Sequence, residues 1–453
     1  MTAVQTNGRR SYFAIPLLVL FLVAIVGAWL RPGAVPAAGA ALNAGDTAWM
    51  LAASALVLFM TPGLSFFYGG MVRSRNVVST MLQSFVAMGV IGVLWVVVGF
   101  SLAFGDSIGG LIGDPRTFLM FRHVGAETNV TLAATIPLVL FAFFQLKFAI
   151  ITPALITGSF AERVRFSSYL LFICLWSIVI YCPLAHWTWH PDGFLHKWGV
   201  LDFAGGTVVH VSAGVAALVG AMVLGRRKTH LASEPHSPAN IPFVLLGTGM
   251  LWFGWFGFNA GSAGAANGQA AMAFATTNTA SAAAALTWIF IDGWKGRKPT
   301  ALGFCVGAVV GLVAITPAAG YVTVGDSLLI GALGATVSNL MVHWRSQTTL
   351  DDTLDVFPCH GVGGMVGMLL TGVFAKDVGL VNGTPTTFLH HLAALVIVTA
   401  YVAVGSFALY KLTNAIIPLR VTPEDEEVGL DLSQHGEVMD EAAANAAFGL
   451  ART

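Results

Sequence analysis

Residues 202–214 read DFAGGTVVHVSAG, and residues 355–364 read DVFPCHGVGG. Each stretch places a histidine, His210 or His360, in an apolar run, with an aspartate before it and a glycine four residues after it. Ionisable side chains at membrane depth are costly and usually mark a path for substrate or protons. One buried histidine alone is more often a hydrogen-bonded core residue. A matched pair in two halves of a chain favours one shared site between them.

The composition identifies a membrane protein. Of the 453 residues, 56% are hydrophobic and 10% are charged, whereas soluble domains carry about 25% charged residues. The formal net charge is zero, so nothing indicates a nucleic acid as partner. The four cysteines stand singly, without disulfide or metal-ligand spacing, and no HExxH motif is present. We therefore expect no metal and no cofactor, and we discount an intramembrane metalloenzyme built on the two histidines.

Eleven apolar runs are long enough to cross a bilayer. They fall near 46–70, 81–104, 133–158, 166–186, 203–225, 241–260, 270–291, 299–318, 326–344, 358–375 and 387–412, with a further candidate at 13–30. Thirteen Lys and Arg residues near the ends of these runs fall on one side and four on the other. The positive-inside rule places the first side in the cytoplasm. The first of the eleven runs then begins outside, and the C-terminus ends inside.

The two ends of the chain differ in composition from its middle. Arg9 and Arg10 precede the apolar run 13–30, and small residues at 38–40 follow it, as in a secretory signal peptide. We predict that residues 1–42 are a signal peptide or a retained anchor. Residues 43–418 form the membrane domain in this prediction. The polar, acidic segment 419–453 is expected to be a cytoplasmic regulatory tail.

The expected fold is an all-α integral membrane protein with two inverted five-helix repeats and one extra helix. One set of five runs includes the run with His210, and the other set of five includes the run with His360. An odd number of spans in each half gives the halves opposite topology, which is a recurring plan of transporters. In that plan, polar residues of both halves meet near the middle of the membrane.

Four segments resemble the ammonium transporter (Amt/Mep/Rh) family, bacterial Amt branch. They are the two histidine segments, WFGFNAGSAG at 255–264 and SFAERVRF at 159–166. The resemblance runs from about residue 46 to about residue 437. It implies ammonium transport rather than catalysis, a homotrimer with a pore in each eleven-helix subunit, and location in the bacterial cytoplasmic membrane.

The chemistry of ammonium limits how such a pore can work. Moving a bare cation into hydrocarbon costs tens of kcal/mol. Removing a proton from ammonium at neutral pH costs only about 3 kcal/mol. Deprotonation also rejects potassium, which has no proton to lose. A selective path therefore needs an outer cation site, an apolar gate, and a narrow lane for neutral ammonia and a proton.

The resemblance assigns Trp189, Ser262 and Phe148 to the outer ammonium site. An indole face attracts a cation by roughly 0.5–2 kcal/mol, and a serine hydroxyl can accept a hydrogen bond from N–H. Without the resemblance, Trp189 would be interpreted as an interfacial residue. Asp202 is expected mainly to cap the next helix and secondarily to favour the approaching cation. We expect Asp355 to act similarly in the other half.

Phe148 and Phe258 are the expected gate, and Phe144 is a third gate candidate by position, because it lies one turn from Phe148 on the same helix face. His210 and His360 then line the lane. A neutral imidazole has one donor and one acceptor nitrogen, so the two rings can hydrogen-bond to one another. Such a pair could pass a proton beside ammonia, or it could order a file of neutral ammonia. We expect the first, with one charge carried per ammonium.

Two features keep alternatives open. Lys147 stands where relatives carry a small or apolar residue, and it is turned about 100° from Phe148, so we expect it to face away from the lane. The tail residues GLD at 429–431 and HGE at 435–437 resemble the segment through which a PII-type signalling protein helps to close the pores of bacterial relatives. The alternatives are an ammonium sensor with little conduction, and an electroneutral ammonia channel of the Rh type. Rh relatives typically lack the outer Trp, which is present here as Trp189.

Overall fold

The computed structural model describes residues 17–19, 21–22, 25–26 and 40–439. Almost all of the expected signal peptide or anchor at 1–42 lies outside the described residues, and so does the end of the tail from residue 440. Within 40–439 the regular secondary structure is helical apart from one small two-stranded sheet, β1 (Ser107–Ile108) with β2 (Ile112–Gly113). The expected all-α class is confirmed.

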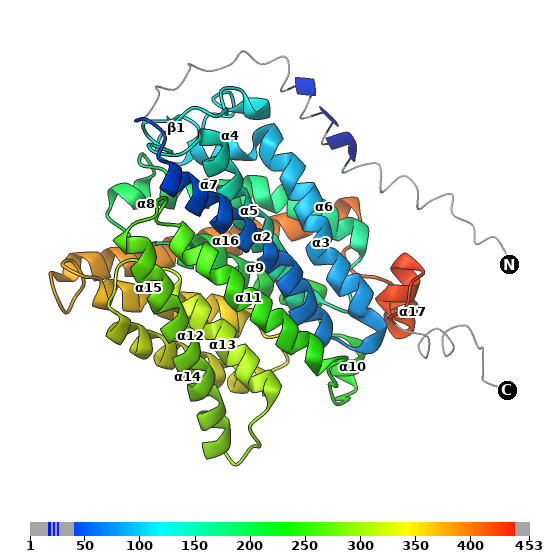
Figure 1. Cartoon of the computed structure of the whole chain (residues 1–453). Helices are drawn as coiled ribbons and strands as arrows, with labels where there is room; N and C mark the ends of the chain where they lie inside the picture. The colour runs from blue at the N-terminus through cyan, green and yellow to red at the C-terminus, as the bar shows by residue number, and fades with distance from the viewer. Residues whose placement is uncertain (1–16, 20, 23–24, 27–39, 440–453) are drawn as a thin grey trace.

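A helical segment lies at each of the eleven runs expected from the sequence (Figure 1). The first six are α2 (Ala44–Met71); α3 (Val77–Leu94) with η2 (Trp95–Gly99) and α4 (Phe100–Phe104); α5 (Leu138–Phe160); α6 (Phe166–Trp176) with η4 (Ser177–Tyr181) and α7 (Cys182–Trp189); η5 (Gly206–Val211) with α9 (Ser212–Leu224); and α11 (Ile241–Gly261). The last five are α12 (Gly268–Trp294); α13 (Ala301–Ile315); α14 (Val324–Ser346); η6 (Phe357–Val362) with α15 (Gly363–Phe374); and α16 (Pro385–Ile416).

Shorter elements occupy the connections. These are η1 (Ser74–Asn76), η3 (Leu119–Phe121), α8 (Phe194–Lys197), α10 (Lys228–Leu231), α17 (Pro423–Val428) and η7 (Asp431–His435). We call the end that carries segment 105–137 the outer end, because the charge bias places it outside. The end that carries α10 and α17 is the inner end, and Figure 1 shows these elements on the far side of the bundle from β1 and α8.

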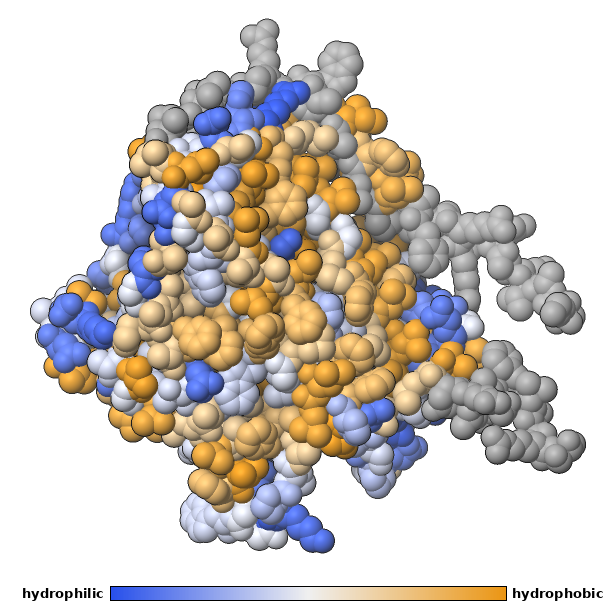
Figure 2. Space-filling model, in the orientation of Figure 1, coloured by the Kyte–Doolittle hydropathy of each residue, from blue (hydrophilic) through white to orange (hydrophobic). Residues whose placement is uncertain are grey.

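Nine helical segments within the described residues are long and apolar enough to cross a membrane. α12 and α13 complete the eleven, although the 15 residues of α13 extend only about 22 Å at 1.5 Å per residue. Figure 2 shows broad apolar surface over the middle of the molecule, with hydrophilic residues gathered towards its ends. The structure is therefore that of a protein with many apolar spans, as expected.

Small residues let the long helices approach closely. On α2 and α11, a Cβ added to Gly63 would lie 2.9 Å from Met250, and one added to Gly247 would lie 2.4 Å from the backbone of Phe67. Close contact through small residues is a usual mode of helix packing in membranes. The helix α5 begins five residues later than the expected 133, because residues 129–136 form a loop closed by a bridge between Asn129 and Ala133.

Candidate functional site

A cavity of about 450 Å³ opens at the outer end. Its lining brings together Phe148, Trp189, Asp202 and Ser262, which are all four residues expected at the outer ammonium site. Trp189 is the last residue of α7, and its indole N–H donates to the backbone carbonyl of Asp202 at 3.0 Å. This bond fixes the indole relative to the segment that begins the helix of His210.

Ser262 follows the end of α11, and its hydroxyl donates to the carbonyl of Phe258 at 2.8 Å. Because the hydroxyl proton is used in this bond, the oxygen lone pairs stay free to accept from an N–H donor. A second polar group on the same wall is Gln145, whose buried Oε1 has no partner among the described residues. The sequence reasoning missed Gln145. Its signal was an amide in an apolar helix, three residues before a gate phenylalanine.

Two stacked rings separate this cavity from the interior. The rings of Phe148 and Phe258 lie 4.2 Å apart at 28°, and each side chain is at most 1% exposed. The rings of Trp189 and Phe148 are nearly perpendicular, with a centroid distance of 5.7 Å. Phe144 contacts Phe148 edge to face at 5.0 Å but is not part of the cavity lining. It packs instead against Gly261, so it supports the stacked pair from behind.

Beyond the stacked pair lies a narrow apolar space that holds both histidines. Its volume is about 10 Å³, near the lower limit for one water molecule. Ten apolar side chains surround the two imidazoles: Met60, Leu64, Phe67, Ile151, Leu155, Val209, Leu251, Trp255, Phe258 and Val309. The two residues that were matched in the sequence thus meet in one site.

The imidazoles of His210 and His360 hydrogen-bond to one another through their Nδ1 atoms, 3.3 Å apart. One Nδ1 donates and the other accepts, so a single proton lies between the rings. His210 also stacks on Trp255 at 5.5 Å, and its buried Nε2 has no partner within the described part of the chain. An apolar lane with an unpaired imidazole nitrogen can hydrogen-bond to a small neutral molecule.

Each histidine segment begins with a π-helical turn capped by an aspartate eight residues before the histidine. Asp202 accepts hydrogen bonds from the N–H groups of residues 205, 206 and 207 and from the Thr207 hydroxyl, at 2.5–2.8 Å. The expected capping role of Asp202 is confirmed.

The counterpart of Asp202 in the other half is Asp352, which accepts from Val356 N at 3.2 Å and Phe357 N at 2.8 Å. The expectation that Asp355 plays this part was wrong. Asp355 has a positive φ of 56° instead of the extended backbone usual for a capping residue, and its carboxylate pairs with Arg345 at 2.7 Å.

Lys147 lies on the face of α5 that points away from the helix bundle. Its ammonium group stands over the ring of Phe143 at 5.2 Å, and Phe143 is 40% exposed. Neither the outer cavity nor the histidine lane includes Lys147 in its lining. It therefore faces away from both, as expected from its helical angle.

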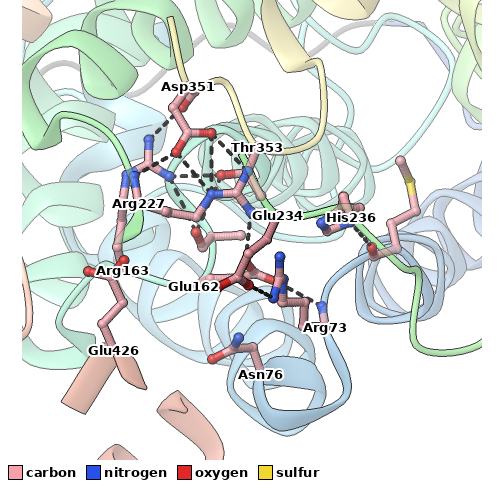
Figure 3. A network of polar contacts seen from close by, with 12 residues as sticks. Arg73, Asn76, Glu162, Arg163, Arg227, Glu234, His236, Asp351, Thr353 and Glu426 are labelled. Atoms are coloured by element: carbon pink, nitrogen blue, oxygen red, sulfur yellow. Dashed lines mark hydrogen bonds and ion pairs between the residues drawn. The ribbon is translucent and has the colours of Figure 1, made fainter. Parts of the chain in front are cut away.

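A buried charge network closes the inner end (Figure 3). Arg227, after α9, pairs with Glu162 at 2.7 Å and with Asp351 at 2.8 Å. Arg163 donates to Thr353 at 2.7 Å and to the Asp351 carbonyl at 2.6 Å. Burial opposes the charge on Asp351, but the hydrogen bonds from Arg227 and the charge of Arg163 outweigh it and hold the pKa of that carboxyl well below its usual range. The network fixes the loop that carries Asp352.

The tail reaches the same inner face. Asp431 accepts from the N–H groups of Val78 at 3.1 Å and Ser79 at 2.7 Å, at the start of α3. Glu426 accepts from Lys228 N at 2.6 Å and pairs with Arg420 at 2.7 Å. Burial raises the pKa of Asp431 to about 6, against the lowering effect of the two backbone bonds. The tail is thus bound to the inner ends of the helices through its acidic side chains.

In residues 40–439 and the few described before them, no group of three His, Cys, Asp or Glu side chains is placed to hold a metal ion. The unpaired Nε2 of His210 and the lone pairs of the Ser262 hydroxyl are instead suited to hydrogen bonds with a ligand that carries N–H groups.

Residues 48–439 match the model of the Ammonium Transporter Family. The chain is 47% identical over 409 residues to an ammonium transporter of Aquifex aeolicus, covering 88% of this chain and 94% of that protein. It is 44% identical to the ammonium transporter of Bacillus subtilis, covering 87% and 98%. Among solved structures, Saccharomyces cerevisiae Mep2 matches with a TM-score of 0.83 at 34% identity, over 92% of this chain and 98% of that one. A structure described as a sensor Amt protein matches with a TM-score of 0.80 at 28% identity, over 86% and 98%.

Proposed function

Because this chain belongs to the ammonium transporter family and transports ammonium, we propose that its outer cavity, stacked phenylalanines and paired histidines act in series on one path. The observation that carries this proposal is the histidine pair itself. Two imidazoles share a hydrogen bond in a lane too small for a hydrated ion and lined otherwise by apolar side chains.

The outer cavity recruits ammonium as a cation. The Trp189 ring offers a face to the charge beside the Phe148 ring, which lines the same cavity, and the Ser262 oxygen accepts one N–H. Potassium, of similar size, gains the ring contacts but donates no hydrogen bond to Ser262. Asp202 favours the cation from the cavity wall, while its oxygens remain bound to the helix they cap.

The stacked pair of Phe148 and Phe258 marks where the charge must be lost. A cation cannot keep its water shell between two rings 4.2 Å apart, and passing without that shell costs far more than losing a proton. Ammonia then enters the lane, where the unpaired Nε2 of His210 hydrogen-bonds to it. The proton crosses along the histidine pair, so that each ammonium transfers one net charge.

The test is the current of reconstituted protein on solid-supported membranes after pulses of ammonium and of potassium. The wild type should give a sustained current with ammonium alone. Trp189→Leu should raise the half-saturating ammonium concentration roughly tenfold, as expected for loss of a cation–π contact of more than 1 kcal/mol. A potassium current in the wild type would refute the deprotonation step. Ammonium binding without current would favour a sensor or an electroneutral channel.

We further propose the location of each part of the chain. Residues 1–42 direct insertion as a signal peptide or anchor, residues 43–418 span the bacterial cytoplasmic membrane, and residues 419–453 lie in the cytoplasm. The distribution of Lys and Arg supports this orientation. Protease digestion of inside-out vesicles should remove the tail and leave loop 105–137 intact; the reverse pattern would invert the topology.

A homotrimer with a pore in each subunit is the assembly we propose. Apolar residues are exposed along several neighbouring helices, among them Phe59 of α2 at 42%, Phe253 of α11 at 54% and Phe274 of α12 at 46%. Such a surface fits either lipid or identical subunits. The mass of the detergent-solubilised complex by native mass spectrometry distinguishes three copies from one.

The tail is the proposed contact for a PII-type signalling protein. Its acidic side chains already occupy the inner ends of α3 and α10, so a bound protein there could act on the inner mouth. Co-purification with a PII protein should be lost when the chain ends before residue 419 and kept when only residues 440–453 are removed. Equal capture by all three forms would exclude the tail as the contact.

A further inference from the structure

His391 lies outside the proposed transport path and is fully buried at 0% exposure on α16. Both of its ring nitrogens have backbone partners. Nε2 lies 2.9 Å from the amide nitrogen of Leu201, and Nδ1 lies 2.7 Å from the carbonyl oxygen of Met368. The two bonds run in opposite directions from one rigid ring.

These partners fix the tautomer of the ring. A backbone N–H only donates, so Nε2 of His391 must accept from Leu201. A carbonyl only accepts, so Nδ1 must carry the hydrogen that is donated to Met368. The ring therefore serves as a neutral bridge with one defined hydrogen.

The bridge joins the two halves of the molecule at the outer cavity. Leu201 directly precedes Asp202, which caps the helix of His210 and accepts the Trp189 indole N–H. Met368 belongs to α15, which continues from the segment of His360. The two elements are close even without the bridge, since a Cβ on Gly206 would lie 3.0 Å from the Met368 sulfur.

We propose that His391 is a positioning residue for the outer ammonium site: by holding Leu201 against α15, it sets where Asp202 and the bound Trp189 indole stand. The proposal rests on the proposed role of Trp189 in recruiting ammonium. His391 touches neither substrate nor proton path. Its loss should weaken recruitment and leave the histidine lane intact.

The test compares His391→Leu with His391→Gln in the ammonium-current assay. Leucine fills the space but leaves the Leu201 N–H and the Met368 carbonyl without partners. Glutamine can accept with its amide oxygen and donate with its amide nitrogen. His391→Leu should raise the half-saturating ammonium concentration roughly tenfold with the maximal current nearly unchanged. His391→Gln should stay near the wild-type value.

The matched control is His390→Leu, because His390 is next in sequence, only partly buried, and in ring contact with Trp198. It should change neither quantity. Should His391→Leu fail to reach the membrane, His391→Asn serves instead: its shorter amide can keep only one of the two bonds, so an intermediate half-saturating concentration is expected.

Two outcomes overturn the proposal. One is an unchanged half-saturating concentration in His391→Leu or, in its place, His391→Asn. The other is equal impairment by glutamine and leucine. Trp189→Leu, measured alongside, distinguishes failure of the outer site from failure of the role of His391. If Trp189→Leu also leaves the half-saturating concentration unchanged, the outer site is wrongly assigned. If Trp189→Leu alone raises it, only the role of His391 fails.

Discussion

The two histidine segments share one local device but stand in opposite surroundings. In each, an aspartate eight residues before the histidine caps a π-helical segment that contains the histidine itself. Asp202 borders the outer cavity and is tied to Trp189 through its backbone. Asp352 is fully buried at the inner end, next to the pairs of Arg227 with Glu162 and Asp351.

The difference indicates a division of labour. The outer segment borders a cavity that is also lined by the Ser262 hydroxyl and by the Gln145 amide, whose Oε1 has no partner among the described residues, and this suits the outer end for binding. The inner segment is surrounded by charged side chains that are paired or hydrogen-bonded to one another and to the backbone, which suits it for holding His360 in place. Substitutions at either end can therefore lower stability, but only those at the outer end should also weaken ammonium recruitment.

The largest expected effect is at the inner end. Arg227→Met removes the partner of two buried carboxylates and should lower the free energy of unfolding by about 3–5 kcal/mol, because uncompensated buried charges are left behind. The midpoint of thermal unfolding in detergent measures this. Arg73→Met is the control, since its pair with the half-exposed Glu234 should contribute about 0–1 kcal/mol. Equal unfolding midpoints for Arg227→Met and Arg73→Met would contradict the stabilising role of the buried network at the inner end.

The next largest expected effect is a difference in stability between variants of the two capping aspartates, Asp202 and Asp352. Asp202→Ala loses four hydrogen bonds and Asp352→Ala loses two. At roughly 1 kcal/mol or more for each bond to a charged group, Asp202→Ala should be the more destabilising variant. It should also weaken ammonium recruitment, which Asp352→Ala should not. Thermal unfolding and half-saturating ammonium concentration, measured on both, test this; the reverse ranking would contradict it.

A pH dependence should separate the ends as well. The folded-state pKa of Asp351 is held below its usual value of 3.8, so the unfolded state takes up the proton first as pH falls. The stabilisation is complete above about pH 4 and should decline below it by about 1.4 kcal/mol per pH unit. In Asp351→Asn this acid-dependent loss should be smaller. Identical slopes of stability against pH in both proteins would exclude Asp351 as the cause.

The smallest expected effect concerns Lys147, which points away from both ends of the path. Lys147→Met should leave the ammonium current nearly unchanged, because the side chain lines neither the cavity nor the lane. A large gain in current would mean that Lys147 repels cations in the pore and would overturn its structural placement.

Much of this arrangement could be predicted from the sequence. The eleven apolar runs, the meeting of His210 with His360 and the cap formed by Asp202 are all present in the structure. Apolar length and the cost of burying an ionisable group act locally, so they can be recognised along the chain. The family resemblance then assigned the outer residues, which the structure brings to one cavity.

Other features depend on partners far apart in sequence and could not be predicted. The sequence pointed to Asp355 as the cap of the second segment, and only the fold shows that Asp352 caps it while Asp355 pairs with Arg345. Phe144 lies on the same helix face as Phe148, but in the fold it packs against Gly261 and supports the ring of Phe148 from outside the cavity. His391 bridges Leu201, which lies 190 positions before it, and Met368, which lies 23 positions before it. No spacing in the sequence predicts these contacts.

The most direct test of the central claim is to measure current and isotopically labelled ammonium uptake in the same proteoliposomes, for the wild type and His210→Leu. Charge and ammonia are expected to cross by way of the histidine pair. The wild type should therefore move one charge per ammonium, and the variant should lose its current. Ammonium uptake without current in the wild type, or undiminished current in His210→Leu, would contradict the account.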